Sequence, residues 1–193
     1  MSRRILLNQG HPDASQPHLC HALASSYDVG AQSAGYSVKH INVAELDFPL
    51  LRSQKDFETG LIPASLKPVQ NELLWAEHLV IFFPLWAGDL PAMLKGFFEQ
   101  VMRPSFSGEH VSFFDKKVLS DRSARVVVMM GMPAVINRWY FRAHSIKSLE
   151  RNLLGIVGIA PVHETLIGLT GNMKPIDAKK WLSKLKRLGE KAE

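Results

Sequence analysis

A buried strand runs directly into an apolar turn and then a helix between residues 79 and 101. Leu79-Val80-Ile81-Phe82 has the continuous β-branched and aromatic character of a strand covered on both faces. The chain breaks at Pro84, turns, and restarts at Pro91, a residue suited to the first turn of a helix. A turn at the carboxyl end of a parallel strand is where doubly wound sheets bind planar ligands. The segment therefore predicts an α/β fold with a ligand site after this strand.

Strand and helix patterns alternate along the whole chain, whose 193 residues are enough for one domain with a single core. This alternation predicts a parallel sheet with helices on both faces. It fits a flavodoxin-like three-layer sandwich with five strands in the order 2-1-3-4-5 and a switch point between the first and third strands. The strands are expected at residues 4–8, 37–43, 78–83, 125–130 and 162–167, and the helices at 16–34, 66–76, 91–102, 136–154 and 177–190.

The pattern Phe-Pro-Leu-Trp-x-Gly-x-x-Pro-Ala-x-Leu-Lys-Gly-Phe-Phe-Glu over residues 83–99 combines prolines, glycines and aromatics in a fixed order. It resembles the flavin-binding segment of the NAD(P)H:quinone oxidoreductase family, the flavodoxin-like reductases of the DT-diaphorase type. The alternative is a plain strand, loop and core helix in which Trp86 only packs, but this leaves the clustered prolines and glycine unexplained. The resemblance implies that a flavin ring contacts Pro84, Leu85, Trp86, Ala87 and Gly88.

The loop after the first strand, residues 10–16, offers donors for an anion. Ser15 is expected to cap the following helix, whose first N–H groups would form an anion site. The loop lacks the glycine patterns of dinucleotide-binding and P-loop folds. It resembles the family's His-Pro-x-x-Ser loop, which implies that His11, Ser15 and Gln16 hold a flavin phosphate. A helix cap without any cofactor contact is the alternative.

The loop after the fourth strand is rich in methionine. Where the family has a Thr-Thr-Gly-Gly type segment at the edge of the flavin, this chain has Met129-Met130-Gly131-Met132. The resemblance implies that Met130 and Gly131 contact the ring through backbone N–H groups, without hydroxyl side chains. Methionines are also common in cores, so a purely structural role for this loop carries equal weight.

Tyr140 and His144 lie four residues apart on the helix expected at 136–154, away from its apolar stripe and beside Lys147 and Arg151. Family members use a Tyr and a His in this region, spaced somewhat further apart, to stabilise the charge of reduced flavin and quinone. The resemblance thus implies catalytic roles for Tyr140 and His144. A solvated Tyr/His pair is the alternative.

No metal site is expected. His18 and His21 are three residues apart on the expected first helix but have no carboxylate or thiolate companion nearby in the sequence. Cys20 is the single cysteine, which excludes an intramolecular disulfide and a multi-cysteine metal site.

Charge and hydropathy point to a cytoplasmic protein without a nucleic-acid partner. The net charge is +5, and much of the excess is carried by lysines on the solvated face of the helix at 177–190. No apolar run approaches the roughly 18 residues that span a bilayer, so no membrane insertion is expected. The sequence after Met1 turns polar too soon for a secretory signal.

The family resemblance implies a flavin-dependent NAD(P)H dehydrogenase that passes two electrons to quinones or similar acceptors by a ping-pong mechanism. FMN is favoured over FAD because the chain is short, and NADH and NADPH remain alternatives as the electron donor. A homodimer is implied, with the site partly lined by the partner chain. Two other functions stay open: a flavin-containing regulatory subunit of a potassium efflux system, and a nitro- or azo-compound reductase.

Overall fold

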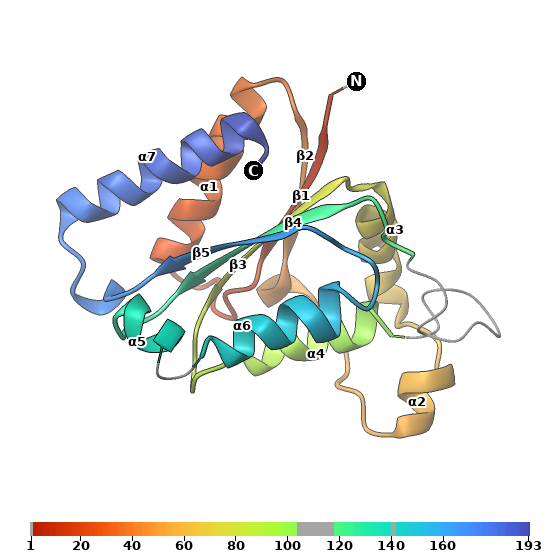
Figure 1. Cartoon of the computed structure of the whole chain (residues 1–193). Helices are drawn as coiled ribbons and strands as arrows, with labels where there is room; N and C mark the ends of the chain where they lie inside the picture. The colour runs from red at the N-terminus through yellow and green to blue at the C-terminus, as the bar shows by residue number, and fades with distance from the viewer. Residues whose placement is uncertain (1, 104–117, 140–141) are drawn as a thin grey trace.

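A five-stranded parallel sheet forms the centre of the computed structural model, which describes residues 2–103, 118–139 and 142–193 (Figure 1). The strand order is β2-β1-β3-β4-β5, and every neighbouring pair is parallel. The predicted order is therefore confirmed, with the switch point between β1 and β3. The strands are β1 (Arg4–Gln9), β2 (Ser37–Asn42), β3 (His78–Pro84), β4 (Ser123–Met129) and β5 (Val162–Ile167).

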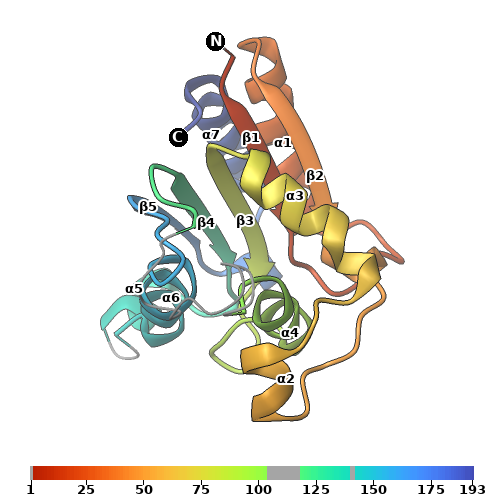
Figure 2. The same ribbon diagram turned by 90° about the vertical axis from the view of Figure 1, so that its right-hand side faces the viewer.

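Helices cover both faces of the sheet, as predicted, and Figures 1 and 2 show the two sets on opposite sides. One face carries α1 (Leu19–Ser33) and α7 (Pro175–Lys191). The other face carries α3 (Lys67–Trp75), α4 (Ala92–Val101), and α6 (His144–Ser148) continued by a π-helix (Leu149–Leu154). The remaining short elements are α2 (Gln54–Thr59), α5 (Ala134–Trp139) and 3-10 turns at Val43–Glu45, Ala64–Leu66 and Thr170–Asn172.

The central strand β3 divides the core into two layers. Because successive side chains of a strand point to opposite faces, Val80 and Phe82 join the layer beneath α1 and α7, whereas Ile81 and Phe83 join the layer beneath α4. All four side chains are fully buried. The continuous apolar run at residues 79–82 is thus explained by burial on both faces of the sheet.

Helices α1 and α7 cross at two glycines. A Cβ atom built on Gly30 would lie 2.0 Å from the backbone oxygen of Lys186, and one on Gly189 would lie 2.0 Å from the backbone oxygen of Tyr27. Ser26 Oγ donates a hydrogen bond to the backbone oxygen of Leu182 at 2.8 Å across the same contact. The two helix backbones therefore touch directly, which only glycine permits at these positions.

The helix predicted over residues 136–154 is wrong as a single element. Helix α5 ends at Trp139, Arg142 and Ala143 adopt left-handed φ values of 52° and 48°, and α6 starts at His144. The physical reason lies in burial. The apolar side chains of α6 and the π-helix pack on the sheet, whereas Trp139 remains 79% exposed beyond the sheet edge. One straight helix cannot serve both positions.

The expected strands and helices leave two long connections, at residues 44–65 and 103–123, which differ in what they contain. The first includes the short helix α2, whose N-cap Ser53 accepts a hydrogen bond from the Asp56 N–H. Most of the second lies outside the described residues.

Candidate functional site

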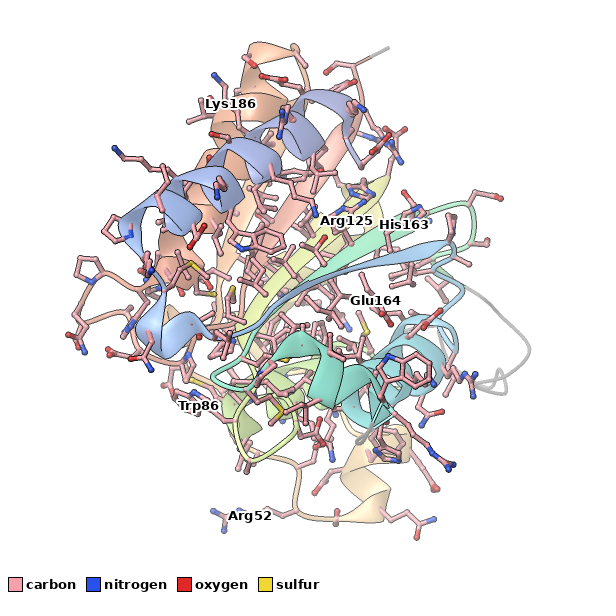
Figure 3. All side chains as sticks on the ribbon, turned by 60° about the vertical axis from the view of Figure 1, so that its left-hand side comes forward. Arg52, Trp86, Arg125, His163, Glu164 and Lys186 are labelled. Atoms are coloured by element: carbon pink, nitrogen blue, oxygen red, sulfur yellow. The ribbon has the colours of Figure 1, made fainter. Side chains whose placement is uncertain are left out.

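Three loops meet at the carboxyl edge of the sheet. The Gly10 N–H donates to the Phe82 oxygen at 2.7 Å, which joins the loop after β1 to the end of β3. The Leu85 N–H donates to the Met129 oxygen at 2.7 Å, which joins the turn after β3 to the end of β4. Figure 3 shows Trp86, in that turn, at the opposite end of the sheet from Arg125 and His163. The loops at the switch point are thus held together by backbone hydrogen bonds.

Asp13 organises the loop between β1 and α1. Its Oδ1 accepts hydrogen bonds from Ser15 N–H at 2.8 Å and Ser15 Oγ–H at 2.6 Å. Its Oδ2 accepts one from Gln16 Nε2–H at 3.3 Å and lies 2.9 Å from His18 Nε2. These contacts, those of the Ser15 hydroxyl first, hold the pKa of Asp13 well below its usual range. The carboxylate is therefore charged and gathers the donors that the sequence predicted for a phosphate.

The expectation that Ser15 caps the helix is wrong. Helix α1 begins at Leu19, and its N-cap residue is His18, which has an extended backbone. The hydroxyl of Ser15 is taken by Asp13, and Pro17 favours extended backbone in the residue before it. Both effects delay the helix by three residues, which leaves Ser15 and Gln16 exposed in the loop.

Three histidines pack against one another beside this carboxylate. The rings of His11 and His18 are stacked, with centroids 3.9 Å apart and planes 20° apart. The ring of His21 lies 5.4 Å from His11 and 5.5 Å from His18. The expectation that His18 and His21 have no carboxylate companion is therefore wrong, because Asp13 contacts His18 from the loop. Sequence reasoning compared only residues on the helix and missed the fold-back of the loop.

Burial and mutual repulsion keep the positive charge of this histidine cluster low. His11 is only 7% exposed, and burial first, then the neighbouring His18, lowers its pKa below the ordinary value. The pKa of His21 is lowered by burial first and then by His18. Asp13 acts in the opposite direction on both rings.

The turn after β3 presents a flat apolar surface beside the cluster. Trp86 and Asp89 exchange backbone hydrogen bonds of 2.9 Å in each direction around Ala87 and Gly88. Both central residues have positive φ, 48° and 81°, which is the pattern of a type I′ turn and explains the glycine. Within the described chain, the N–H groups of Ala87 and Gly88 have no acceptor. Trp86 is 50% exposed and its ring stands edge-on to His11 at 5.9 Å.

The residues flanking this turn have fixed positions in the fold. Pro84 ends β3 and is half-buried, and Leu85 packs against the core. Met130 is 2% exposed and its N–H donates to the Ile167 oxygen at 2.9 Å. Its side chain thus belongs to the core, whereas Gly131 is exposed with open space beside its Cα. A purely structural role therefore fits Met130, whereas contact between Gly131 and a flavin ring stays a prediction.

Of the two residues expected to be catalytic, the structure describes His144 and not Tyr140. Tyr140 lies outside the described residues. His144 is exposed at the start of α6, where it lines a cavity of about 330 Å³ together with Arg142, Lys147 and Arg151. The expectation that His144 shares a face with Lys147 and Arg151 is confirmed by this cavity. Positive side chains therefore concentrate around the histidine.

The donor set fits a phosphate-bearing planar group. The imidazole, hydroxyl and amide groups of His11, Ser15 and Gln16 are of the types that bind phosphate, although Ser15 and Gln16 donate to Asp13 here and would have to turn from it to reach a phosphate. Trp86 supplies a surface suited to a flat heterocycle. Among residues 2–103, 118–139 and 142–193, no group of three or more His, Cys, Asp or Glu has the geometry to hold a metal ion. No helix in the same part of the chain is long and apolar enough to cross a bilayer.

Comparisons with known proteins agree with this architecture. A family model described as "Flavodoxin-like fold" matches residues 3–191. An uncharacterized NAD(P)H oxidoreductase of Haemophilus influenzae is 26% identical over 104 residues, which are 50% of this chain and 52% of the relative. The match thus spans about half the length of that relative.

Two solved structures show the same fold. An NAD(P)H:quinone oxidoreductase from Methanothermobacter marburgensis superposes with a TM-score of 0.82 at 20% identity, covering 100% of this chain and 97% of the other. An FMN-dependent NADH-azoreductase from Bacillus anthracis, solved in complex with FMN, superposes with a TM-score of 0.67 at 17% identity, covering 100% and 99%.

Proposed function

The chain belongs to the family with this flavodoxin-like fold, and from that premise we propose that it is a flavin-dependent NAD(P)H oxidoreductase of the quinone reductase type. This agrees with the family resemblance of residues 83–99. The observation that carries the proposal is the approach of two loops across the switch point, where the ring of His11 stands 5.9 Å from that of Trp86. One loop offers phosphate donors and the other offers a flat apolar surface and two free N–H groups, which are the two needs of a flavin mononucleotide.

Each loop has a defined task in this proposal. His11, Ser15 and Gln16 bind the phosphate, and Trp86 packs against the ring. The unpaired N–H groups of Ala87 and Gly88 donate to the polar edge of the ring, and Pro84 and Leu85 fix the start of the turn. Gly131 lets the backbone approach the ring from the side of β4. FMN is the proposed cofactor because its phosphate matches the donors, and an FMN complex is known for a structural neighbour.

When bound, the flavin supplies the chemistry, taking a hydride from NADH or NADPH and delivering two electrons to a quinone. The chain positions the nicotinamide and the acceptor in turn over one exposed face. We therefore expect ping-pong kinetics, in which the oxidised nucleotide leaves before the quinone binds.

His144 is proposed as the proton donor to the departing hydroquinone oxygen. Its ring is exposed, so its nitrogens can reach a bound acceptor, and imidazole is a common general acid. Arg142, Lys147 and Arg151 around the cavity attract negative charge to the same place. Tyr140 is proposed as a second donor on sequence grounds alone.

A homodimer is proposed as well, with each site completed by the partner chain. Exposed apolar side chains of α5 support it, since Val135, Ile136 and Trp139 are 67%, 45% and 79% exposed beside the candidate site. Light scattering that returns the monomer mass of 21.6 kDa at micromolar concentration contradicts this part of the proposal.

The central experiment is flavin binding followed by turnover. Purified protein is incubated with FMN, desalted and examined by visible absorption, then treated with NADH or NADPH under nitrogen and finally with a simple benzoquinone. We expect a retained yellow flavin that bleaches with the nucleotide and regains its colour with the quinone. Failure to retain either FMN or FAD contradicts the whole proposal. Retention without bleaching contradicts the enzymatic part. Repeating the last step with an azo dye or a nitroaromatic compound defines the acceptor.

Ser15→Ala tests the assignment of the phosphate loop. We expect FMN affinity to fall roughly 10- to 150-fold, because a hydrogen bond to a charged group is worth roughly 1.5 to 3 kcal/mol, while riboflavin affinity stays nearly unchanged. Ser37→Ala is the matched control. Ser37 is exposed at the start of β2, at the amino end of the parallel strands and thus at the opposite end of the sheet from the candidate site. Equal losses for FMN and riboflavin would show that Ser15 only shapes the loop.

A further inference from the structure

The histidine cluster of His11, His18 and His21 has two ring nitrogens free to meet an anion. The Asp13 N–H donates to His11 Nδ1 at 3.1 Å, and the His18 N–H donates to His21 Nδ1 at 3.2 Å. His11 Nδ1 also lies 3.1 Å from the Asp13 backbone oxygen, so it can accept from the Asp13 N–H or donate to that oxygen. His21 Nδ1 accepts, so the proton of the neutral His21 ring lies on Nε2. In the described part of the chain, neither Nε2 atom has a hydrogen-bond partner. His21 thus presents an Nε2–H donor, and His11 can hold a proton on both ring nitrogens, because the Asp13 backbone oxygen can accept from Nδ1–H.

Other groups around the cluster supply little charge. Asp13 is the carboxylate that acts on His11 and His21 among the described residues. Trp86 approaches from the turn after β3 and is neutral. Gln9 and Cys20 lie behind His11, where Gln9 Oε1 accepts from His11 N–H at 3.2 Å and from Cys20 Sγ–H at 2.8 Å. Burial raises the pKa of the Cys20 thiol, so it also stays neutral.

Because Asp13 is the single carboxylate beside the cluster in the described chain, protonation of the cluster depends on whether a further anion is bound. One carboxylate faces three close imidazoles, and repulsion between the rings opposes charging more than one of them. A phosphate placed beside the rings adds up to two negative charges and favours the protonated rings. Binding of phosphate and binding of protons then assist each other, because linkage between two ligands is reciprocal.

We propose that His18 and His21, together with His11, are specificity-determining residues that couple binding of a phosphate monoester at this loop to proton uptake. The inference rests on the proposed function, in that the monoester is the phosphate of FMN. Riboflavin has no phosphate, and each phosphate of a diester-linked pyrophosphate carries a single charge. The cluster therefore favours FMN over riboflavin most strongly on the acid side of neutrality.

The test compares flavin affinities across pH in buffers without phosphate. Dissociation constants of FMN and riboflavin are measured by flavin fluorescence at pH 7.0, 8.0 and 9.0, at least about one unit above the second pKa of a phosphate monoester. We expect FMN affinity to fall about 10-fold or more over this range, since one linked proton gives up to a tenfold change per pH unit. Riboflavin affinity should stay constant within about twofold, a factor that corresponds to less than half a kcal/mol.

Variants assign the effect to the cluster. His21→Gln and His18→Gln should each flatten the pH dependence of FMN binding, whereas His163→Gln should retain it because His163 lies on β5 at the far edge of the sheet. Calorimetry of the unmodified protein in buffers of different ionisation enthalpy measures the protons taken up directly, and it needs no variant to fold. We expect net uptake with FMN and none with riboflavin.

The outcomes separate this inference from the proposed function. FMN binding that is independent of pH, or a riboflavin affinity that changes in parallel, overturns the inference while the flavoprotein assignment stands. A full pH dependence retained in both His18→Gln and His21→Gln also overturns it. No FMN binding at any pH contradicts both.

Discussion

The pH dependence of stability should be dominated at mildly acid pH by one buried histidine, His78. It is 1% exposed at the start of β3, and its Nδ1 lies 2.8 Å from Ser123 Oγ. Arg3 Nη2 donates to the same Oγ at 2.7 Å, so a guanidinium lies close to the His78 ring and opposes a second positive charge there. Burial first, then the charges of Arg3 and Arg125, lowers the pKa of His78 to about 3.

The sign and size of the effect follow from the two pKa values. In the unfolded chain His78 titrates near its ordinary value of 6.5, whereas in the folded protein it titrates at about 3. Between these values the unfolded state binds the proton preferentially, so stability is full above about pH 6.5 and is lost as pH falls. Two pH units at about 1.4 kcal/mol each give a loss of roughly 2 to 3 kcal/mol between pH 6.5 and 4.5.

His78→Asn removes the titrating group and keeps an amide near the position of Nδ1. Urea unfolding followed by tryptophan fluorescence at pH 7.5, 6.5, 5.5 and 4.5, without added flavin, gives the free energy of unfolding of each protein. The difference between the original protein and His78→Asn should shrink by about 2 to 3 kcal/mol from pH 6.5 to 4.5. His144→Asn, the same change at an exposed helix position that does not act on His78, should follow the original protein. A difference that stays constant with pH refutes the reasoning.

Three further predictions concern the site and the helix contact. Trp86→Ala should lower FMN affinity by roughly 10- to 100-fold in a fluorescence titration, because it removes the apolar surface beside the proposed ring. Gly189→Ala should lower the free energy of unfolding by about 1 to 3 kcal/mol through overpacking against Tyr27, whereas Gly171→Ala, which meets no atom within 4 Å, should change it little. His144→Gln should slow reoxidation of the flavin by quinone in stopped-flow experiments more than it changes flavin binding; wild-type rates in both half-reactions contradict its catalytic role.

The strands and their order could be predicted from the sequence, because patterns of burial act locally along each strand. All residues of β3 from His78 to Phe83 are buried, as the apolar run at residues 79–82 predicted. The switch point followed from the strand order alone, and so did the meeting of the loops that carry His11 and Trp86. The strand order itself came with the resemblance to flavodoxin-like reductases, because alternating strands and helices fit more than one doubly wound order.

The errors arose where a tertiary contact overrode a local preference. Ser15 is a good N-cap residue in isolation, yet the carboxylate two residues before it takes both its hydroxyl and its N–H. The break at Arg142 and Ala143 has no glycine or proline to announce it, since it follows from which apolar side chains reach the sheet. The carboxylate companion of His18 was missed because a five-residue separation across a helix start is not a helical spacing.

The glycine contact between α1 and α7 also bears on how the chain opens. Helix α1 carries His18 and His21 at its start, and α7 lies along it with backbones touching at Gly30 and Gly189. Residues packed this closely protect one another's amides, so the two helices should exchange hydrogen with solvent as one cooperative unit, although 141 residues lie between the end of α1 and the start of α7. The loop that carries Asp13 is then anchored at the start of a helix that opens together with α7.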